Sequence, residues 1–198
     1  MRKYFLLAIL VILLSFPVMA SGFYFDIGFG LGGGWTFIDG NNFLKELEKA
    51  GVDVSTLGVN LDLKAGYGPF GRVPLFIVGN FGGIGHRIYD KNNYIQFNSY
   101  IAGAGVIFYP IKWLQLALDA GMSWGVNQTD IPGIIMYNTS GIGFAWDVSI
   151  AADLGGPKHG FLIGLKYIAA YNTLETSKAD INSSVLGIFF KYAYRNKL

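Results

Sequence analysis

The chain of 198 residues contains no cysteine and little charge. Without cysteine it can form no disulfide, and it lacks the lipid-bearing cysteine of a lipoprotein. Charged residues make up 14% of the chain, whereas an ordinary globular protein has about 25%. The net charge is only +2, and Lys and Arg form no run that could follow a phosphate backbone. These absences argue against a nucleic-acid partner and against an ordinary water-exposed surface.

Residues 1–20 have the features of a secretory signal peptide. Arg2 and Lys3 supply the positive end, the apolar stretch FLLAILVILLSF follows, and Val18, Met19 and Ala20 form the cleavage site. We therefore expect an exported chain in which residues 21–198 form a single domain. Beyond Ala20 no run of about 18 apolar residues occurs, which argues against a helical membrane protein.

The remaining apolar residues alternate with a period of two. From Phe23 to Phe37, bulky apolar side chains at odd positions oppose small or polar ones at even positions. A strand of about fifteen residues is roughly two to three times the usual length, and such strands suit the crossing of a bilayer. Seven further segments show the pattern, giving eight predicted strands; the others are 59–68, 75–82, 95–107, 114–124, 142–154, 161–167 and 186–192.

The segment 95–107 is assigned to the same scheme. Its expected apolar outer face carries Ile95, Phe97, Ile101 and Ile107. The opposite face is expected to place four smaller or polar side chains inside, namely Gln96, Asn98, Ala102 and Ala104.

The predicted connections alternate in length. Those after the second, fourth and sixth strands are short, and the others are long. Short turns at one end and long loops at the other are typical of an outer-membrane β-barrel with periplasmic termini. We therefore predict an all-β fold, an eight-stranded antiparallel up-and-down transmembrane β-barrel. Aromatic side chains are expected to form girdles at its two rims, Tyr109, Trp113, Tyr192 and Tyr194 at one and Trp35, Tyr94 and Trp124 at the other.

The residue types on the two faces indicate which face meets lipid. A soluble barrel would also alternate, but its water-exposed face would carry many Lys, Glu and Thr residues. Here the less apolar face is mostly Gly, Ala, Asn and Ser, and no charge falls on the apolar face of the central spans. Because a lipid-facing Lys or Arg at midplane costs about 2–4 kcal/mol, this absence is expected of a membrane barrel.

Two segments carry a resemblance to a known group of proteins. They are the hairpin from Tyr100 to Gly125 and the closing strand GIFFKY, residues 187–192. With them, residues 21–198 resemble the small eight-stranded outer-membrane barrels of the OmpA/OmpX/OmpW-like superfamily. The closing strand is similar to the signal that the outer-membrane assembly machinery reads during insertion. The resemblance to OmpW implies a narrow channel or a binder for a small apolar ligand, in a monomer surrounded by outer-membrane lipid.

Charged residues on the inner faces are the first candidate site. They either line a small polar passage or form a structural ion network, and pairing is expected because eight strands leave a lumen just wide enough for side chains. The candidate lumen network consists of Asp26, Asp62, Lys64, Asp119, Asp147, Lys166 and Lys191.

The segment GFGLGG at residues 28–33 fits the dinucleotide-binding pattern G-x-G-x-x-G. It continues into Trp35 and Phe37 in strand alternation, whereas the cofactor loop must open a helix. We therefore expect no cofactor here. Gly28, Gly30, Gly32 and Gly34 are instead predicted to face inward, where the missing side chains would leave room for a lumen cavity.

Catalysis and metal binding have little support in the sequence. His86 and His159 are the only histidines and are expected at opposite ends of the barrel, with no serine placed to hydrogen-bond either of them. We therefore predict no enzyme, no metal and no cofactor.

Two outer loops are distinctive. In the first, NNFLKELEKAG is predicted to form a short helix with Phe43, Leu44, Leu47 and Ala50 on one face and Gly51 at its C-terminal cap. This helix could cap the barrel mouth, present a binding surface, or pack on its own loop. In the third, the apolar IPGIIMY could extend the barrel wall, fold into the mouth or contact a partner.

Two functions remain open. The first is a narrow channel or small-molecule binder, and the alternative is a structural or surface-interaction barrel with a closed lumen and functional outer loops.

Overall fold

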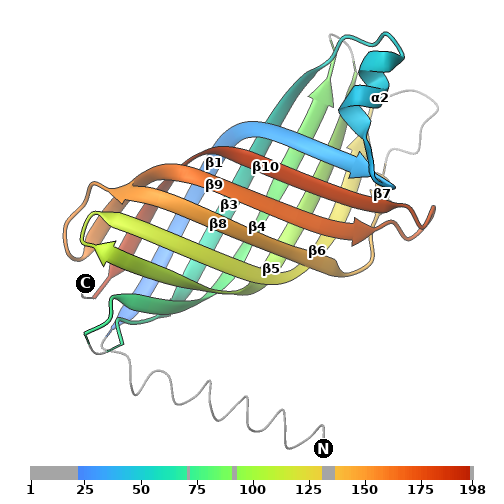
Figure 1. Cartoon of the computed structure of the whole chain (residues 1–198). Coiled ribbons are helices and arrows are strands. Elements are labelled where there is room, and N and C mark those ends of the chain that lie inside the picture. The colour runs from blue at the N-terminus through green and yellow to red at the C-terminus, as the bar shows by residue number, and fades with distance from the viewer. Residues whose placement is uncertain (1–21, 71, 91–92, 131–136, 197–198) are drawn as a thin grey trace, which may run out of the picture.

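The computed structural model describes residues 22–70, 72–90, 93–130 and 137–196, and the predicted signal peptide lies outside these residues. The chain forms a closed antiparallel barrel of eight long strands (Figure 1). These strands are β1 (Phe23–Ile38), β3 (Ser55–Tyr67), β4 (Leu75–Tyr89), β5 (Tyr94–Ile111), β6 (Leu114–Thr129), β8 (Gly143–Asp153), β9 (His159–Thr173) and β10 (Asp180–Arg195). Two short strands, β2 (Asn41–Asn42) and β7 (Tyr137–Thr139), extend the loops. The eight predicted strands and the fold class are confirmed.

The barrel closes between its first and last strands. β10 pairs with β1 along an antiparallel register that runs from Tyr24 opposite Arg195 to Ile38 opposite Ile181. Every other long strand pairs with the strand before and after it in the chain. Closure leaves no sheet edge, so backbone N–H and C=O groups can pair without water, as a lipid environment requires.

The two ends of the barrel differ. The turn end carries the three short connections, residues 68–74, 112–113 and 154–158, and both ends of the described barrel lie there (Figure 1). The loop end carries α2 (Phe43–Lys49), β2, β7 and the connections 39–54, 90–93, 130–142 and 174–179. The predicted alternation of lengths is therefore only partly right: 39–54 and 130–142 are long, but 90–93 is shorter than the turn 68–74, because β4 and β5 extend to Tyr89 and Tyr94 at this end. The loop segment IPGIIMY lies outside the described residues except for its last position, Tyr137, which begins β7.

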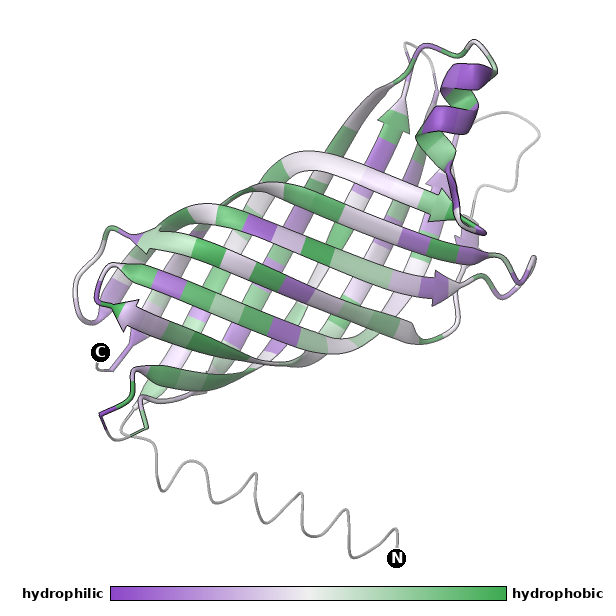
Figure 2. Cartoon of the chain, in the orientation of Figure 1, coloured by the Kyte–Doolittle hydropathy of each residue, from purple (hydrophilic) through white to green (hydrophobic). Residues whose placement is uncertain are grey.

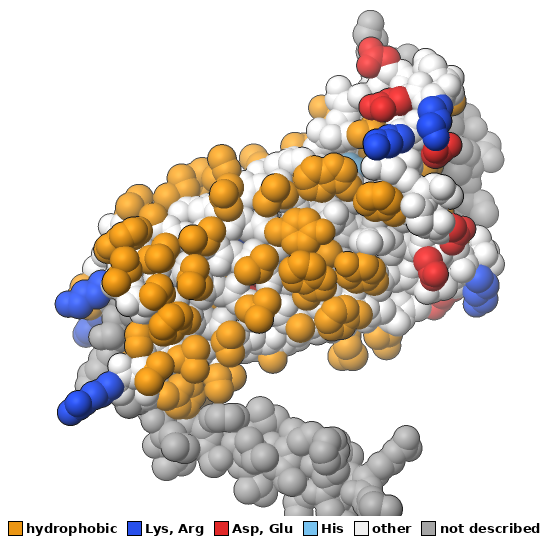
Figure 3. Space-filling view, in the orientation of Figure 1, with side chains coloured by type: hydrophobic (Ala, Val, Ile, Leu, Met, Phe, Trp, Pro, Cys, Tyr) orange, Lys and Arg blue, Asp and Glu red, His pale blue; other side chains and the backbone are white. Residues whose placement is uncertain are grey.

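The outer wall of the barrel is apolar. Figure 2 shows hydrophobic and more polar positions alternating along the strands, and Figure 3 shows hydrophobic side chains across the wall with charged side chains gathered at the two ends. Leu61, Leu118 and Leu165 are each more than half exposed. Large apolar side chains held outward at this density are what a surface in contact with lipid requires.

The face assignment of β5 was wrong. Phe97, Ile101 and Ile107 are buried in the lumen, whereas Tyr100 and Val106 are exposed on the outer wall. Both faces of this strand are apolar, so hydropathy does not distinguish them. A glycine on the inner face does distinguish them. A Cβ on Gly105 would lie 2.1 Å from Asp119 Oδ1, so the side of β5 that carries Gly105 has to face the lumen carboxylate. Four residues of β5 that were predicted to face the lumen belong instead to the outer face, namely Gln96, Asn98, Ala102 and Ala104.

Tyr109 is the exception among the predicted girdle residues. It belongs to the inward face of β5 and is 1% exposed, so it lies inside the turn end rather than at the lipid interface. Trp113 at the turn end and Trp35 near the loop end are exposed, as expected of interfacial aromatics. Tyr100 stacks with Trp124 at 5.9 Å between ring centroids, which places an aromatic pair on the outer wall toward the loop end.

The predicted helix is present and covers the loop end of the lumen. The Asn42 side chain accepts a hydrogen bond from Lys45 N at 3.1 Å and caps its first turn, and Gly51 follows its last turn with φ +79°. Phe43, Leu44 and Leu47 form its apolar face. That face packs on an apolar cluster contributed by the barrel strands and the last loop, namely Ile88, Phe97, Leu174 and Ile181. In the part of the chain that the structure describes, no helix is long and apolar enough to cross a membrane.

Candidate functional site

The seven predicted charged residues meet in the middle of the lumen. Lys64 on β3 contacts Asp119 on β6 and lies 3.7 Å from Asp62 and 4.0 Å from Asp147. Lys166 on β9 lies 2.9 Å from Asp62 and 3.3 Å from Asp147. Two ammonium groups from opposite sides of the barrel are thus shared among three carboxylates, and all five side chains are buried.

The seam between β1 and β10 joins the same network. Lys191 contacts Asp62 and lies 3.6 Å from Asp26 Oδ1, while Tyr24 donates a hydrogen bond to Asp26 Oδ2 at 2.8 Å. The lumen network therefore joins six of the eight strands, β1, β3, β6, β8, β9 and β10. Buried charges are costly unless paired, and this arrangement pairs each ammonium group with at least two carboxylates.

A second polar layer lies between the network and the turn end. Gln115 donates to Tyr24 Oη at 3.0 Å and to Tyr109 Oη at 2.7 Å. Arg195 donates to Tyr109 Oη at 3.0 Å and pairs with Asp153 Oδ2 at 2.6 Å. This layer was not predicted from the sequence. The alternation of side chains along β10 could have predicted the position of Arg195. Arg195 is four residues after Lys191, so the two side chains must lie on the same, inner face of the strand.

On the loop side of the network the lumen turns apolar. Ile84, Ile101, Ile168 and Val185 come from four different strands and pack together with two alanines. A buried hydrogen-bonded group follows, in which Ser123 donates to Asn172 Oδ1 at 2.8 Å. The cluster beneath α2 then fills the outermost part. Polar and apolar side chains therefore alternate in layers along the whole lumen.

His86 has a different environment from the one predicted. It lies on the inner face of β4 and is fully buried, where a hydrogen-bonding partner for the imidazole was not expected. Its Nδ1 lies 2.8 Å from Thr36 Oγ1, which lies 3.2 Å from Ser183 Oγ, so a hydroxyl group does contact this imidazole. His159 lies at the turn end, 2.7 Å from Tyr192 Oη. The two histidines are at opposite ends, as predicted, and among the described residues no group of three or more His, Asp or Glu side chains is arranged to hold a metal ion.

The expected cavity beside the four inward glycines is filled. A Cβ on Gly28 would meet the Lys191 side chain at 2.2 Å, one on Gly30 would meet Asn60 at 2.5 Å, and one on Gly34 would meet the His86 ring at 2.3 Å. Side chains from neighbouring strands thus occupy the space that the glycines leave. Gly32 differs, because its Cβ would lie 2.1 Å from the backbone oxygen of Leu186. Here the missing side chain allows β1 and β10 to approach closely.

Substitution of Gly32 by alanine should therefore destabilise the seam. The new methyl group would meet backbone atoms that cannot rotate away, and overpacking of this kind costs about 1–3 kcal/mol. Urea titration of the refolded barrel measures the loss. Gly79→Ala is the matched control, since a Cβ there meets nothing nearer than 3.8 Å. Equal stability of the two variants would contradict the close approach at the seam.

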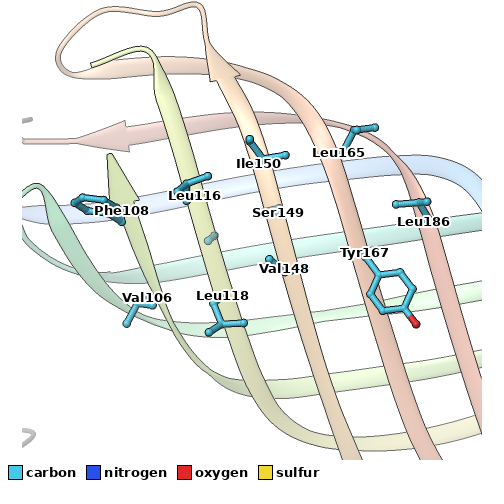
Figure 4. A pocket seen from close by; sticks show the side chains of 11 residues that line it. Val106, Phe108, Leu116, Leu118, Val148, Ser149, Ile150, Leu165, Tyr167 and Leu186 are labelled. Carbon is cyan, nitrogen blue, oxygen red and sulfur yellow. The ribbon is translucent and has the colours of Figure 1, made fainter. Parts of the chain in front are cut away.

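Apolar depressions lie on the outer wall. One of about 430 Å³ is formed by outward side chains of β5, β6, β8, β9 and β10, including Phe108, Leu118, Val148, Leu165 and Tyr167 (Figure 4). Because these side chains belong to the apolar outer surface of the barrel, the depression is a feature of the wall and not of the lumen.

The geometry defines a class of protein: a closed eight-stranded antiparallel barrel with an apolar outer wall and a charged, filled lumen. Its fold is similar to that of Ail, the attachment invasion locus protein of Yersinia pestis, in complex with the heparin analogue sucrose octasulfate. The identity is 16% over 85% of this chain and 98% of that chain, with a TM-score of 0.53. It is also similar to Neisserial surface protein A, at 16% identity over 85% and 95% of the two chains and a TM-score of 0.51. No family model and no curated protein matches the chain.

Proposed function

We propose that the chain is a monomeric, non-enzymatic outer-membrane β-barrel whose loop end faces outward and makes contacts at the cell surface. The observation that carries this proposal is the filled lumen. Charged, apolar and hydrogen-bonded layers follow one another from the turn end to α2, and side chains contact one another across each layer. A barrel built in this way is a rigid support, so its variable chemistry lies in the loops.

The channel or small-molecule binder implied by the OmpW resemblance is the weaker proposal. The space beside Gly28, Gly30 and Gly34, where a passage was expected, holds the side chains of Lys191, Asn60 and His86. A conducting path would have to displace the paired charges of the network, which is costly because removal of one partner leaves a buried charge unpaired.

The similarity to an attachment protein supports a surface role, but the sucrose octasulfate bound to that protein does not suit this chain. Among the described residues, the loops at this end carry three basic side chains, Lys45, Lys49 and Lys178, and a fourth, Arg87, lies nearby on the outer wall of β4. The same end carries eight acidic ones, all exposed: Asp39, Glu46, Glu48, Asp53, Asp90, Asp130, Glu175 and Asp180. This acidic surplus would repel a polysulfated molecule such as sucrose octasulfate, so the proposed contacts are with a different kind of partner.

Two measurements on the full chain test the proposal. In planar bilayers the refolded barrel should give no stable conductance. Expressed on a Gram-negative host, it should increase adhesion to an epithelial monolayer, and replacement of residues 39–54 by a short Gly/Ser linker should return adhesion toward that of the empty host. The unboiled gel shift controls for folding of both forms. Stable single-channel steps, or adhesion that is unchanged by loss of the segment, would contradict the proposal.

A further inference from the structure

A polar row crosses the apolar outer wall on β4 and β5 near the loop end. Arg87 on β4 pairs in register with Gln96 on β5, and both side chains face outward. Gln96 Oε1 accepts hydrogen bonds from Arg87 Nε, at 2.8 Å, and from Arg87 Nη2, while Gln96 Nε2 donates to Asn98 Oδ1 at 2.6 Å. Among the described residues of the eight long strands, Arg87 is the only Lys or Arg that faces outward.

The guanidinium group of Arg87 is held in place by direct contacts with uncharged side chains. Its partner Gln96 is an uncharged acceptor that uses two of the five N–H donors, and its carbon lies 4.6 Å from the centroid of the Tyr94 ring. Asp90 and Asp130 line the same small pocket at the loop end as Arg87, and each of their carboxylates also accepts one backbone N–H group, from Asn93 and Tyr94 respectively. Gln96 and Tyr94 thus orient the exposed Arg87 side chain on the wall, where it retains unused N–H donors.

An apolar pocket of about 400 Å³ lies directly beside this polar row. Gly83 and Gly85 belong to its lining and have no side chain, while Leu61, Phe81 and Tyr100 line it with large side chains. Gly85 pairs with Asn98 and Gly83 with Tyr100, so the pocket continues along the strands from the point where the polar row ends.

The order of apolar and polar groups along the wall matches the order of the parts of a lipid molecule. An apolar slot, an amide and a cation follow one another along β4 and β5, beside the aromatic pair Tyr100 and Trp124 that suits the membrane interface. We propose that this wall site binds a bilayer lipid with an anionic phosphate head, its acyl chain in the glycine-lined pocket and its phosphate on Arg87. The site rests on the membrane placement proposed above and is independent of what the loops contact.

Lipid retention by the full chain tests the site. The barrel is refolded in nanodiscs that hold equal amounts of phosphatidylglycerol and phosphatidylcholine with the same acyl chains, and retained lipids are counted by native mass spectrometry. The native chain should retain phosphatidylglycerol preferentially. Arg87→Gln keeps a hydrogen-bonding side chain but removes the charge, and should reduce this preference about fivefold, the effect of one basic residue near an anionic membrane surface. Arg87→Lys should restore most of it.

Matched variants separate the site from general electrostatics. Arg72→Gln removes the same charge from an exposed turn at the opposite end and should leave the preference unchanged. Gly85→Leu should reduce retention of both lipids, because the new side chain fills the pocket where a Cβ meets only side-chain atoms, at 3.0 and 3.1 Å. Equal retention of the two lipids by the native chain, an equal loss in Arg87→Gln and Arg72→Gln, or full displacement by inorganic phosphate would overturn the proposal. Adhesion and conductance should be the same in Arg87→Gln and the native chain, so failure of the lipid site is distinguishable from failure of the proposed function.

Discussion

Replacement of Lys64 by methionine should lower the stability of the folded barrel by about 3–5 kcal/mol, the usual effect of removing one partner from a buried ion pair. Lys64 contacts Asp119 and is within 4.0 Å of Asp62 and Asp147, and all four side chains are buried. Methionine fills a similar volume, so the loss would come from the unpaired carboxylates rather than from a cavity. Urea titration in phosphatidylcholine vesicles, followed by the gel mobility of unboiled samples, measures it.

Two controls make this result specific to the charge. Lys112→Met changes an exposed turn lysine and should cost little. Lys64→Met combined with Asp119→Leu removes one charge of each sign, so the net charge of the lumen network is the same as in the native protein. The double variant should recover part of the stability lost in the single variant, since a buried ion pair can often be replaced by apolar side chains. If Lys64→Met were as stable as the native chain, the lumen network would not contribute to the stability of the barrel.

An arginine in place of Leu118 should cost about 2–4 kcal/mol, the penalty of a basic side chain at the bilayer midplane. Leu118 is 54% exposed on the outer wall of β6, between the exposed Trp113 at the turn end and Trp124 toward the loop end. A charge at this position would have to leave water. The same vesicle titration measures the loss of stability.

Leu154 provides the matched control for this variant. It is even more exposed and lies in the short connection that follows β8, at the turn end. Leu154→Arg should cost about 0–1 kcal/mol, because the penalty falls steeply toward the interface. Equal costs at the two positions would contradict the membrane placement of the wall.

The sequence predicted strand faces well where one face was clearly the more apolar. In β1, eight odd positions carry almost all the large apolar side chains, and the structure places them outside. In β5 both faces carry Ile, Val or aromatic residues, so periodicity located the strand but could not orient it. Its orientation depends on pairing with β4 and β6 and on the space that Gly105 leaves for Asp119.

The candidate site was predictable in part for the same reason. Parity alone places Asp62, Lys64 and Lys166 inside the lumen, and pairing then follows from the narrow interior. Parity does not show how far a side chain reaches across the barrel. The contacts of Asn60 with Gly30 and of His86 with Gly34 depend on the stagger of neighbouring strands, which only the assembled barrel fixes.

The lumen network also has a consequence for how the barrel assembles. Lys166 pairs with Asp62 across 104 residues of sequence, and the last strand supplies Lys191 to the same carboxylate. Such pairs have high contact order, because they form only when distant segments of the chain meet. Until β10 arrives, the carboxylates of β1 and β3 lack part of their counter-charge. Closure of the wall and neutralisation of its interior are therefore one cooperative event, and an intermediate that lacks the last strand would retain unpaired charge where the finished barrel excludes water.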